Sequence, residues 1–281
     1  MQVIMTEEQK SILITGCSSG IGRYVANELK IRGYRVFATA RKPEDVKNLQ
    51  AAGFESIQLD LANSSSIRNA VDNILQLSGG KLFALFNNGA YGQPGAVEDL
   101  TRDVLRDQFE VNLFGTHELT NLVIPVMRRQ GYGRIIQNSS VLGFIAMKYR
   151  GAYNASKYAL EGLTDTLRLE LKGSNIFISL IEPGPIESAF RKNAYSSYQR
   201  NICKARSYHK DVYEVLAKRL QTEGPVVPFT LGPEAVARKV IHALESKRPR
   251  VRYYVTFPTY IFACLKRILS VRLLDRILIR I

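Results

Sequence analysis

The segment AYNASKY, residues 152–158, carries a tyrosine four residues before a lysine. The chain has 14 tyrosines, but Tyr153 and Lys157 are its one pair with this spacing, which alone could arise by chance. On a helix the two side chains would share one face. A nearby ammonium favours the phenolate and lowers the pKa of tyrosine from its usual value of about 10. The pair could therefore pass a proton to a carbonyl oxygen whose carbon receives a hydride.

Two further polar residues could complete such a site. Ser140 follows a strand-like run, and strand ends and helix starts share the carboxyl edge of a parallel sheet. Ser140 could donate to the oxygen that gains charge, with Ser139 as the alternative. Asn112, in FEVNLFG, could hold a water that relays protons to Lys157, or it could simply satisfy buried backbone groups. The expected catalytic set is Ser140, Tyr153, Lys157 and Asn112.

A glycine-rich turn, TGCSSGIG at residues 15–22, precedes a predicted helix. Its glycines permit a tight turn and a close approach of backbone to a pyrophosphate, which would face the helix N-terminus. We therefore expect a dinucleotide here, although a plain strand-to-helix turn would look similar. The residues assigned to this contact are Gly16, Ser18, Ser19, Gly20, Ile21 and Gly22.

The second predicted strand ends Thr39-Ala40-Arg41-Lys42, without the acid that an NAD site places about 20 residues past the glycines. Arg41 could instead grip a 2′-phosphate with two hydrogen bonds, which predicts NADP as the cofactor. Glu44 and Asp45 follow closely and leave some use of NAD open. An exposed loop charge is the alternative for Arg41.

More cofactor contacts are expected after the third and fourth predicted strands. Asp60 could accept a hydrogen bond from the adenine amine or could cap a helix, and Leu61 is its neighbour. Asn88 and Gly89 follow the fourth strand, where small residues let a ribose or adenine ring lie against the backbone.

Short apolar runs alternate with amphipathic ones along the chain. The predicted strands are 11–15, 35–39, 56–60, 82–86, 134–139 and 176–181, with a seventh near 250–256. Helices are predicted near 20–32, 43–51, 64–78, 101–130 and 151–173. Because the strands are continuously apolar, they should be buried on both faces. The pattern predicts an α/β fold: a doubly wound parallel sheet of about seven strands, the Rossmann fold, in one domain spanning residues 1–256.

The chain resembles the short-chain dehydrogenase/reductase family over nearly its whole length. The matching residues are TGCSSGIG at 15–22, the pair Asn87-Asn88, Asn112, Ser140, YNASK at 153–157 and PGPI at 183–186. The resemblance implies that serine, tyrosine, lysine and asparagine form the catalytic set. It also implies that Pro183, Gly184 and Ile186 lie along the nicotinamide, and that Ser188, Tyr153 and Lys157 contact the cofactor. One departure is Gly89-Ala90, where the family usually has Ala-Gly, and alanine would fit poorly if residue 90 needed a positive φ.

TARKPEDV, SLIEPGPIESAF and the extended C-terminus look closest to a bacterial branch of the family. That branch is similar to 17β-hydroxysteroid and retinol dehydrogenases and includes NADP-dependent aldehyde reductases. The likeness implies an alcohol or carbonyl oxidoreductase of the EC 1.1.1 class acting on a bulky, apolar aldehyde, ketone or alcohol. It also suggests a homodimer or homotetramer formed through the long helices. A non-catalytic NADP-binding sensor or a membrane-surface scaffold is the alternative.

Residues 187–232 lose the periodicity, gather aromatic residues and would overhang the nicotinamide as a lid. Phe190 could line an apolar substrate pocket there with Ser140 and Tyr153, or the aromatic residues could be packing residues. Residues 257–281 would form a basic amphipathic extension. Its apolar residues fall on two faces that differ in phase, which predicts two short helices. The first face holds Ile261, Cys264, Leu265, Ile268 and Leu269, and the second holds Leu273, Leu274, Ile277 and Leu278.

The net charge of +14 is concentrated at the C-terminal end, where residues 247–281 hold nine basic side chains and one acid, a net +8. The apolar runs there are too short to span a bilayer. Residues 258–281 could lie on a membrane surface, or could pack on the domain or another subunit. We expect no nucleic acid partner, because no module interleaves aromatic and basic residues. Three separated cysteines, no metal-ligand spacing and no visible secretory signal lead us to expect no bound metal and a cytoplasmic protein, with peripheral contact at the inner membrane face as an option.

Overall fold

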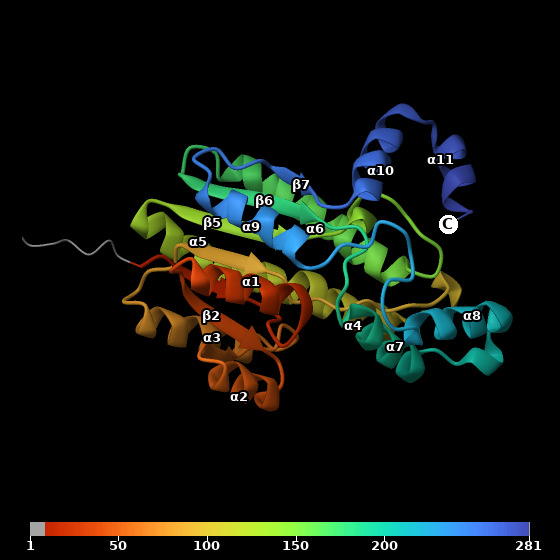
Figure 1. The fold of residues 1–281 in the computed structure, drawn as a ribbon, viewed down its shortest axis with the longest axis horizontal. Coiled ribbons are helices and arrows are strands. Elements are labelled where there is room, and N and C mark those ends of the chain that lie inside the picture. The colour runs from red at the N-terminus through yellow and green to blue at the C-terminus, as the bar shows by residue number, and fades with distance from the viewer. Residues whose placement is uncertain (1–8, 281) are drawn as a thin grey trace, which may run out of the picture.

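The computed structural model describes residues 9–280, and its centre is one parallel sheet of seven strands (Figure 1). The strand order is β3-β2-β1-β4-β5-β6-β7, so the chain reverses its direction of travel across the sheet between β1 and β4. Ligands of such sheets bind at this switch point, outside the carboxyl ends of the strands. The predicted doubly wound fold is confirmed, with strands β1 (Ser11–Ile14), β2 (Arg35–Ala40), β3 (Glu55–Gln58), β4 (Ala84–Asn87), β5 (Gly133–Asn138), β6 (Ile176–Glu182) and β7 (Arg252–Tyr254).

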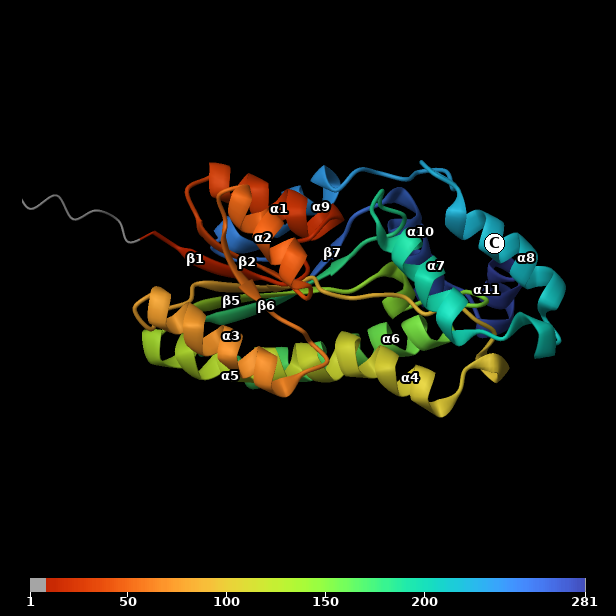
Figure 2. The ribbon, with the colours of Figure 1, turned by 90° about the horizontal axis from the view of Figure 1, so that it is seen from below.

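Helices cover both faces of the sheet (Figure 2). One face carries α1 (Gly20–Ile31), α2 (Pro43–Ala51) and α9 (Glu234–Glu245), and the other carries α3 (Ser64–Leu77), α5 (Thr116–Gln130) and α6 (Gly151–Glu170). Successive side chains of a strand point to opposite faces. Accordingly, Ile12 and Ile14 pack with α1 and α9, whereas Leu13 packs with α3 and α5. Burial of the central strands on both faces explains their continuous apolar sequence. The expected burial is wrong for the edge strand β3, whose Glu55 and Gln58 are exposed because no further strand covers that edge.

The long helix predicted near 101–130 is interrupted. It consists of α4 (Arg102–Phe109), a π-helical segment labelled η2 (Glu110–Gly115) and α5. Gly115 lies so close to the carbonyl oxygen of Leu61 that a Cβ there would come within 1.8 Å of it. Such π segments often occur at functional sites, and this one contains Asn112.

Three helices lie outside the predicted helix ranges: α7 (Phe190–Asn201), α8 (Lys210–Gln221) and α9. The first two lie within the proposed lid, residues 187–232, and pack around the buried tyrosines Tyr198 and Tyr213. Tyr213 also accepts a hydrogen bond from the backbone N–H of Ala96, 2.9 Å away. Tertiary packing of aromatic residues therefore stabilises helices whose own sequence pattern is weak. Short 3₁₀ segments, η1 (Val97–Asp99), η3 (Val141–Gly143) and η4 (Lys204–Arg206), complete the elements of the described chain.

The C-terminal extension forms two helices, α10 (Phe257–Ile268) and α11 (Val271–Leu278), as predicted. They project from the same end of the molecule as α7 and α8 (Figures 1 and 2). The predicted apolar face of α10 does not face the domain, because the buried side chains of that helix are Thr259 and Ala263. Among residues 9–280, no helix is long and apolar enough to cross a bilayer.

Candidate active site

Tyr153 lies in the first turn of α6, at the carboxyl edge of the sheet, and is 9% exposed. Burial disfavours the charged phenolate and raises the pKa of Tyr153 to about 12. A hydrogen bond with Ser140 and the positive charge of Arg150 oppose that rise. The phenol of the free protein is therefore protonated at neutral pH.

Lys157 lies one helical turn further along α6, with its Nζ 5.7 Å from the centroid of the Tyr153 ring. Its Nζ donates a 2.7 Å hydrogen bond to the backbone oxygen of Asn138. Burial lowers the pKa of Lys157 to about 8, although the nearby carboxylate of Glu161 opposes this. In the protein alone, Arg150 is the cation that most lowers the pKa of Tyr153. Burial makes Lys157 easier to deprotonate than an exposed lysine, and its helical spacing in the sequence does not show this effect.

The loop after β5 distinguishes the two candidate serines. The hydroxyl of Ser140 accepts a 3.1 Å hydrogen bond from the N–H of Leu142 and lies 3.5 Å from the oxygen of Pro183. Ser139 faces the other way, beside Glu161, where both would crowd a Cβ on Gly143. The geometry favours Ser140 as the serine that accompanies Tyr153.

Asn112 is buried, and its side-chain amide forms three hydrogen bonds. Its oxygen accepts from the N–H of Tyr91 at 3.1 Å, and its nitrogen donates to the oxygen of Tyr91 at 2.9 Å and to Ser156 at 3.2 Å. Asn112 therefore fixes the loop that follows β4 against the start of α6. Its expected role as a water holder stays a prediction.

The glycine-rich turn has the geometry of an anion site. Gly16 and Gly20 have φ values of +71° and +57°, which favour glycine. A Cβ on Gly16 would lie 2.9 Å from the Cα of Gly89, so the backbone segments are in close contact. Ser19 begins α1 without capping it through its side chain, which leaves the first N–H groups of the helix available to a phosphate. These features fit a binding site for the pyrophosphate of a dinucleotide. The same turn contains Ser18, which is exposed, Ile21, which is half-buried, and Gly22, which is buried.

The side chain of Asn88 stabilises this turn through hydrogen bonds. Its side-chain nitrogen donates to the oxygens of Thr15 and Gly16 at 3.0 and 3.3 Å, and its oxygen accepts from Asn138 at 2.9 Å. Gly89 donates its N–H to the hydroxyl of Thr15 at 2.7 Å. Ala90 has no positive φ, so the departure from the usual Ala-Gly order introduces no backbone strain.

The residues proposed to recognise the adenosine end lie past β2 and β3. Arg41 is exposed, and its guanidinium forms no ion pair within residues 9–280. Asp60 lies two residues past β3, and its carboxylate accepts from the N–H of Ala62 at 3.0 Å. Asp60 is not the helix cap, because Asn63 caps α3 by accepting from the N–H of Ser66. Leu61 is buried beside Gly89 and Gly115.

The segment after β6 lies between the glycine-rich turn and Tyr153. Pro183 accepts a 2.8 Å hydrogen bond from the N–H of Val141, and Ile186 pairs with Leu231. Ser188 lies against Gly20, since a Cβ on that glycine would be 3.0 Å from the Cβ of Ser188. Gly184 instead lies against Thr256, whose hydroxyl would be 2.1 Å from a Cβ there. Close packing on Thr256 is thus a structural reason for this glycine.

An apolar cluster surrounds the Tyr153 ring. Phe190, at the start of α7, meets it edge to face with ring centroids 5.3 Å apart. The sequence analysis missed the other members, which are Val141, Leu142, Phe144, Ile145, Met147, Phe262 and Leu278. The five residues between Val141 and Met147 could have been predicted from the sequence, because they follow Ser140 directly. No local sequence pattern connects Phe262 or Leu278 with the site.

A buried pair of carboxyl groups lies behind Lys157. Glu182 ends β6 and is 0% exposed, and Glu161 is one turn beyond Lys157 on α6. Nε of Arg252 lies 3.0 Å from an oxygen of Glu182 as an ion pair, and neither Glu182 oxygen accepts a hydrogen bond from residues 9–280. Arg252 also pairs with Glu161 at 3.1 Å and Asp165 at 2.7 Å. Burial, followed by the charge of Glu161, raises the pKa of Glu182 from 4.5 to about 8.

We therefore predict that the stability of the protein falls as pH rises towards 8. Between pH 4.5 and about 8, Glu182 keeps its proton in the folded protein and releases it in the unfolded chain. The contribution of Glu182 to the free energy of unfolding is therefore complete below pH 4.5 and is lost as pH rises to about 8. The slope would be up to about 1.4 kcal/mol per pH unit, or roughly 2–4 °C in Tm. Glu182→Gln should flatten the profile of Tm against pH, and Glu170→Gln, an exposed control on α6, should not. Identical profiles for wild type and Glu182→Gln would contradict this assignment.

Comparison with known proteins identifies the family. The sequence profile described as short chain dehydrogenase matches residues 10–199. The "Uncharacterized oxidoreductase YbbO" of Escherichia coli K12 is 43% identical over 270 residues, covering 96% of this chain and 94% of that protein. Human retinol dehydrogenase 8 is 30% identical, with 88% and 82% covered. An NADPH-dependent 3-dehydrocapnine reductase of Ornithobacterium rhinotracheale is 31% identical, with 94% of each chain covered.

Solved structures agree with the sequence relatives. An actinorhodin polyketide ketoreductase variant with NADPH superimposes with a TM-score of 0.72 at 27% identity, covering 89% of this chain and 97% of that one. A Burkholderia phymatum short-chain dehydrogenase/reductase with NAD gives 0.76 at 25% identity, with 93% and 94% covered. The chain therefore belongs to the short-chain dehydrogenase/reductase family and is an oxidoreductase of that family, which confirms the resemblance. Because these two complexes contain different cofactors, they leave the choice between NAD and NADP open.

Proposed function

We propose that this protein is an NADPH-dependent reductase that converts an apolar aldehyde or ketone to its alcohol. The observation that carries the proposal is the buried Tyr153 phenol, which lies beside Ser140 and within an apolar cluster. Burial raises the pKa of Tyr153 to about 12 in the protein alone, so the phenol is protonated, and the nearby positive charge of Lys157 would ease release of that proton as the carbonyl oxygen gains negative charge.

The proposed chemistry divides the work among the residues already placed. A bound NADPH supplies the hydride. Tyr153 donates its proton to the carbonyl oxygen, and the Ser140 hydroxyl donates a hydrogen bond to the same oxygen as its charge grows. Lys157 supplies positive charge one turn away, and Asn112 holds the Tyr91 loop and, as predicted from sequence, a water. Phe190 would pack against the apolar part of the substrate.

The preference for NADP rests on Arg41. Its unpaired guanidinium stands past the end of β2, where a 2′-phosphate would lie, and no acid occupies that strand tip. The related 3-dehydrocapnine reductase is named as NADPH-dependent, which supports the same choice. The remaining proposed cofactor contacts are Gly16, Ser18, Ser19, Gly20, Ile21, Gly22, Asp60, Leu61, Asn88, Gly89, Pro183, Gly184, Ile186 and Ser188.

We also propose a homodimer or homotetramer of a cytoplasmic protein, with residues 258–281 in peripheral contact with a membrane. Apolar side chains are exposed on the helical face formed by α4 to α6, at Leu105, Phe114, Leu163 and Leu169. Light scattering coupled to size exclusion measures the assembly.

Turnover tests the proposed function directly. Purified protein should oxidise NADPH when it is given at least one member of a panel of aliphatic, retinoid and steroid carbonyls. If it binds NADPH but none of the carbonyls is reduced, the protein is a non-catalytic NADP-binding sensor or scaffold, and the enzyme proposal is wrong.

A further inference from the structure

The outward face of α10 is apolar, which reverses the usual arrangement of a surface helix. Its buried side chains are small, at Thr259 and Ala263. The opposite face exposes large apolar groups, with Ile268 72% exposed and Val271, just beyond the helix, 75% exposed. Such a run of exposed apolar groups marks an interaction surface. We call it the apolar stripe, and it comprises Phe229, Phe257, Tyr260, Ile261, Cys264, Ile268 and Val271.

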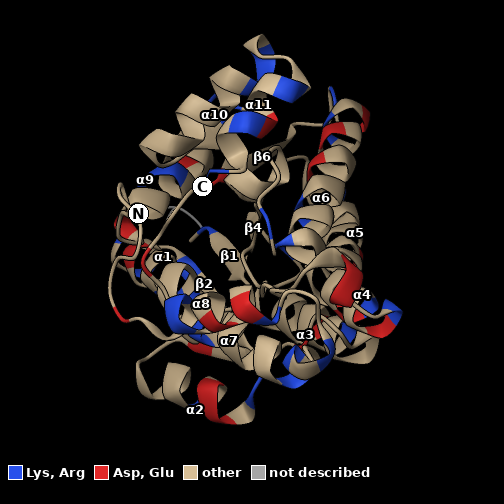
Figure 3. Cartoon of the chain, turned by 90° about the vertical axis from the view of Figure 1, so that its right-hand side faces the viewer, with Lys and Arg blue, Asp and Glu red and all other residues tan. Residues whose placement is uncertain are grey.

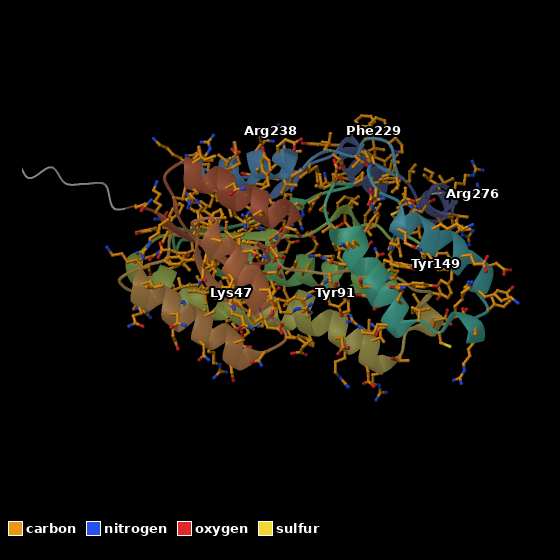
Figure 4. All side chains as sticks on the ribbon, turned by 60° about the horizontal axis from the view of Figure 1, so that its bottom comes forward. Lys47, Tyr91, Tyr149, Phe229, Arg238 and Arg276 are labelled. Carbon is orange, nitrogen blue, oxygen red and sulfur yellow. The ribbon has the colours of Figure 1, made fainter. Side chains whose placement is uncertain are left out.

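Phe229 joins the apolar stripe from a distant loop. Its ring centroid lies 5.1 Å from that of Phe257, and its side chain is 57% exposed. It has a φ of +61°, a left-handed conformation that is rare for a bulky residue. Figure 4 labels it near the same end of the molecule as Arg276 of α11. A strained backbone that holds an aromatic ring outward is consistent with a binding role.

Unpaired cations accompany the apolar stripe. Four arginines on or beside α10 and α11 are exposed, and none forms an ion pair within residues 9–280; they are Arg267, Arg272, Arg276 and Arg280. Asp275 is the one acid of these two helices. Figure 3 shows that the charged segments on and beside α11 are mostly blue. Apolar groups flanked by cations match an anionic lipid surface, because the arginines meet headgroups while the apolar groups enter the interface. A second copy placed face to face would bring the arginines together, which disfavours a dimer through this surface.

The inner faces of the same helices reach the proposed active site. Phe262 of α10 and Leu278 of α11 belong to the apolar cluster around Tyr153. Lys266 donates to the oxygen of Phe144, and Lys148 donates to the oxygen of Ile279 at 2.7 Å. These bonds hold both helices against the loop that follows Ser140. The outer face of α10 therefore carries most of the apolar stripe, while its inner face and α11 contribute to the apolar cluster that contains Tyr153.

We propose that α10, α11 and Phe229 dock on an anionic lipid surface, and that the substrate is a lipophilic carbonyl compound that passes from that surface to Tyr153. The docking follows from the apolar stripe and its arginines alone. The passage of substrate rests on the proposed reductase function. The two parts are therefore tested by separate measurements.

Flotation with vesicles tests the docking without cofactor or substrate. The full chain should float with phosphatidylcholine vesicles that contain phosphatidylglycerol, and should stay unbound with phosphatidylcholine alone. Ile261→Gln with Ile268→Gln should weaken binding roughly tenfold or more, because two apolar groups no longer enter the interface. Arg267→Gln with Arg272→Gln and Arg276→Gln should weaken it roughly 100-fold at low salt.

Matched exposed positions away from the surface serve as controls. Ile31→Gln and Arg238→Gln, on α1 and α9, should bind anionic vesicles as wild type does (Figure 4 labels Arg238). The docking is wrong if wild type does not float with anionic vesicles, or if the controls weaken binding as much as the stripe variants. It is also wrong if the double isoleucine variant dissociates an oligomer while vesicle binding is unchanged, since the stripe would then join two copies.

Activity separates the second part from the proposed function. With NADPH and a long-chain aldehyde held in anionic vesicles, the double isoleucine variant should turn over at least about tenfold more slowly than wild type. With a short, water-soluble aldehyde, the two should be equal. If the double isoleucine variant and wild type turn over both substrates at equal rates, the proposed passage of substrate from the lipid surface is wrong. No turnover by wild type on either substrate would overturn the reductase function, while flotation would still decide the docking.

Discussion

Tyr153→Phe should lower the kcat for NADPH-dependent carbonyl reduction by roughly 10²–10⁴-fold. The substitution removes one hydroxyl and keeps the ring that packs edge to face against Phe190. Because the buried phenol is the proposed proton donor, its loss should affect the chemical step and leave the affinity for NADPH within about twofold. Steady-state kinetics and NADPH fluorescence titration measure the two quantities.

Tyr158→Phe is the matched control for this substitution. Tyr158 lies on the same helix, is partly exposed and contacts Lys266 rather than the apolar cluster around Tyr153. Its kcat should equal that of wild type. If Tyr153→Phe keeps full activity, another group supplies the proton and the assigned chemistry is wrong.

Arg41→Ala should lower kcat/KM for NADPH by roughly 10–100-fold, because a charge-assisted, two-pronged contact with the 2′-phosphate is lost. The kcat/KM for NADH, which has no 2′-phosphate, should change by less than about twofold. Arg41 is exposed and its guanidinium forms no ion pair within residues 9–280, so the fold should tolerate the change. Steady-state kinetics with each cofactor give the ratio of kcat/KM for NADPH to kcat/KM for NADH.

Lys47→Ala provides the control for a lost surface cation near the same strand. Lys47 is exposed on α2 (Figure 4), and its loss should leave both cofactors unaffected. An equal decrease for NADPH and NADH in Arg41→Ala would mean that this residue does not read the 2′-phosphate.

The parts of the site that could be predicted are those carried by local sequence. The glycine-rich turn, the strand that ends at Ser140 and the helix that begins near Tyr153 each form from neighbouring residues. The parallel sheet then brings their carboxyl ends to one edge. The order of the motifs therefore sufficed to place Tyr153 beside Ser140.

Other features depend on contacts between distant segments. Phe262 and Leu278 reach the Tyr153 cluster from more than 100 residues away, and no local pattern indicates that contact. The α7 and α8 helices were missed because buried tyrosines from both helices stabilise them. Burial lowers the pKa of Lys157 to about 8, and the sequence shows its helical spacing but not its desolvation.

Transfer of deuterium from NADPH that carries deuterium at both C4 positions of the nicotinamide is the most direct test of the central claim. The account predicts that wild-type protein places one deuterium on the former carbonyl carbon of an apolar aldehyde, and that Tyr153→Phe places almost none in the same time. Mass spectrometry of the alcohol measures both. Alcohol formed without the label, or label transferred equally by the two proteins, would contradict the account.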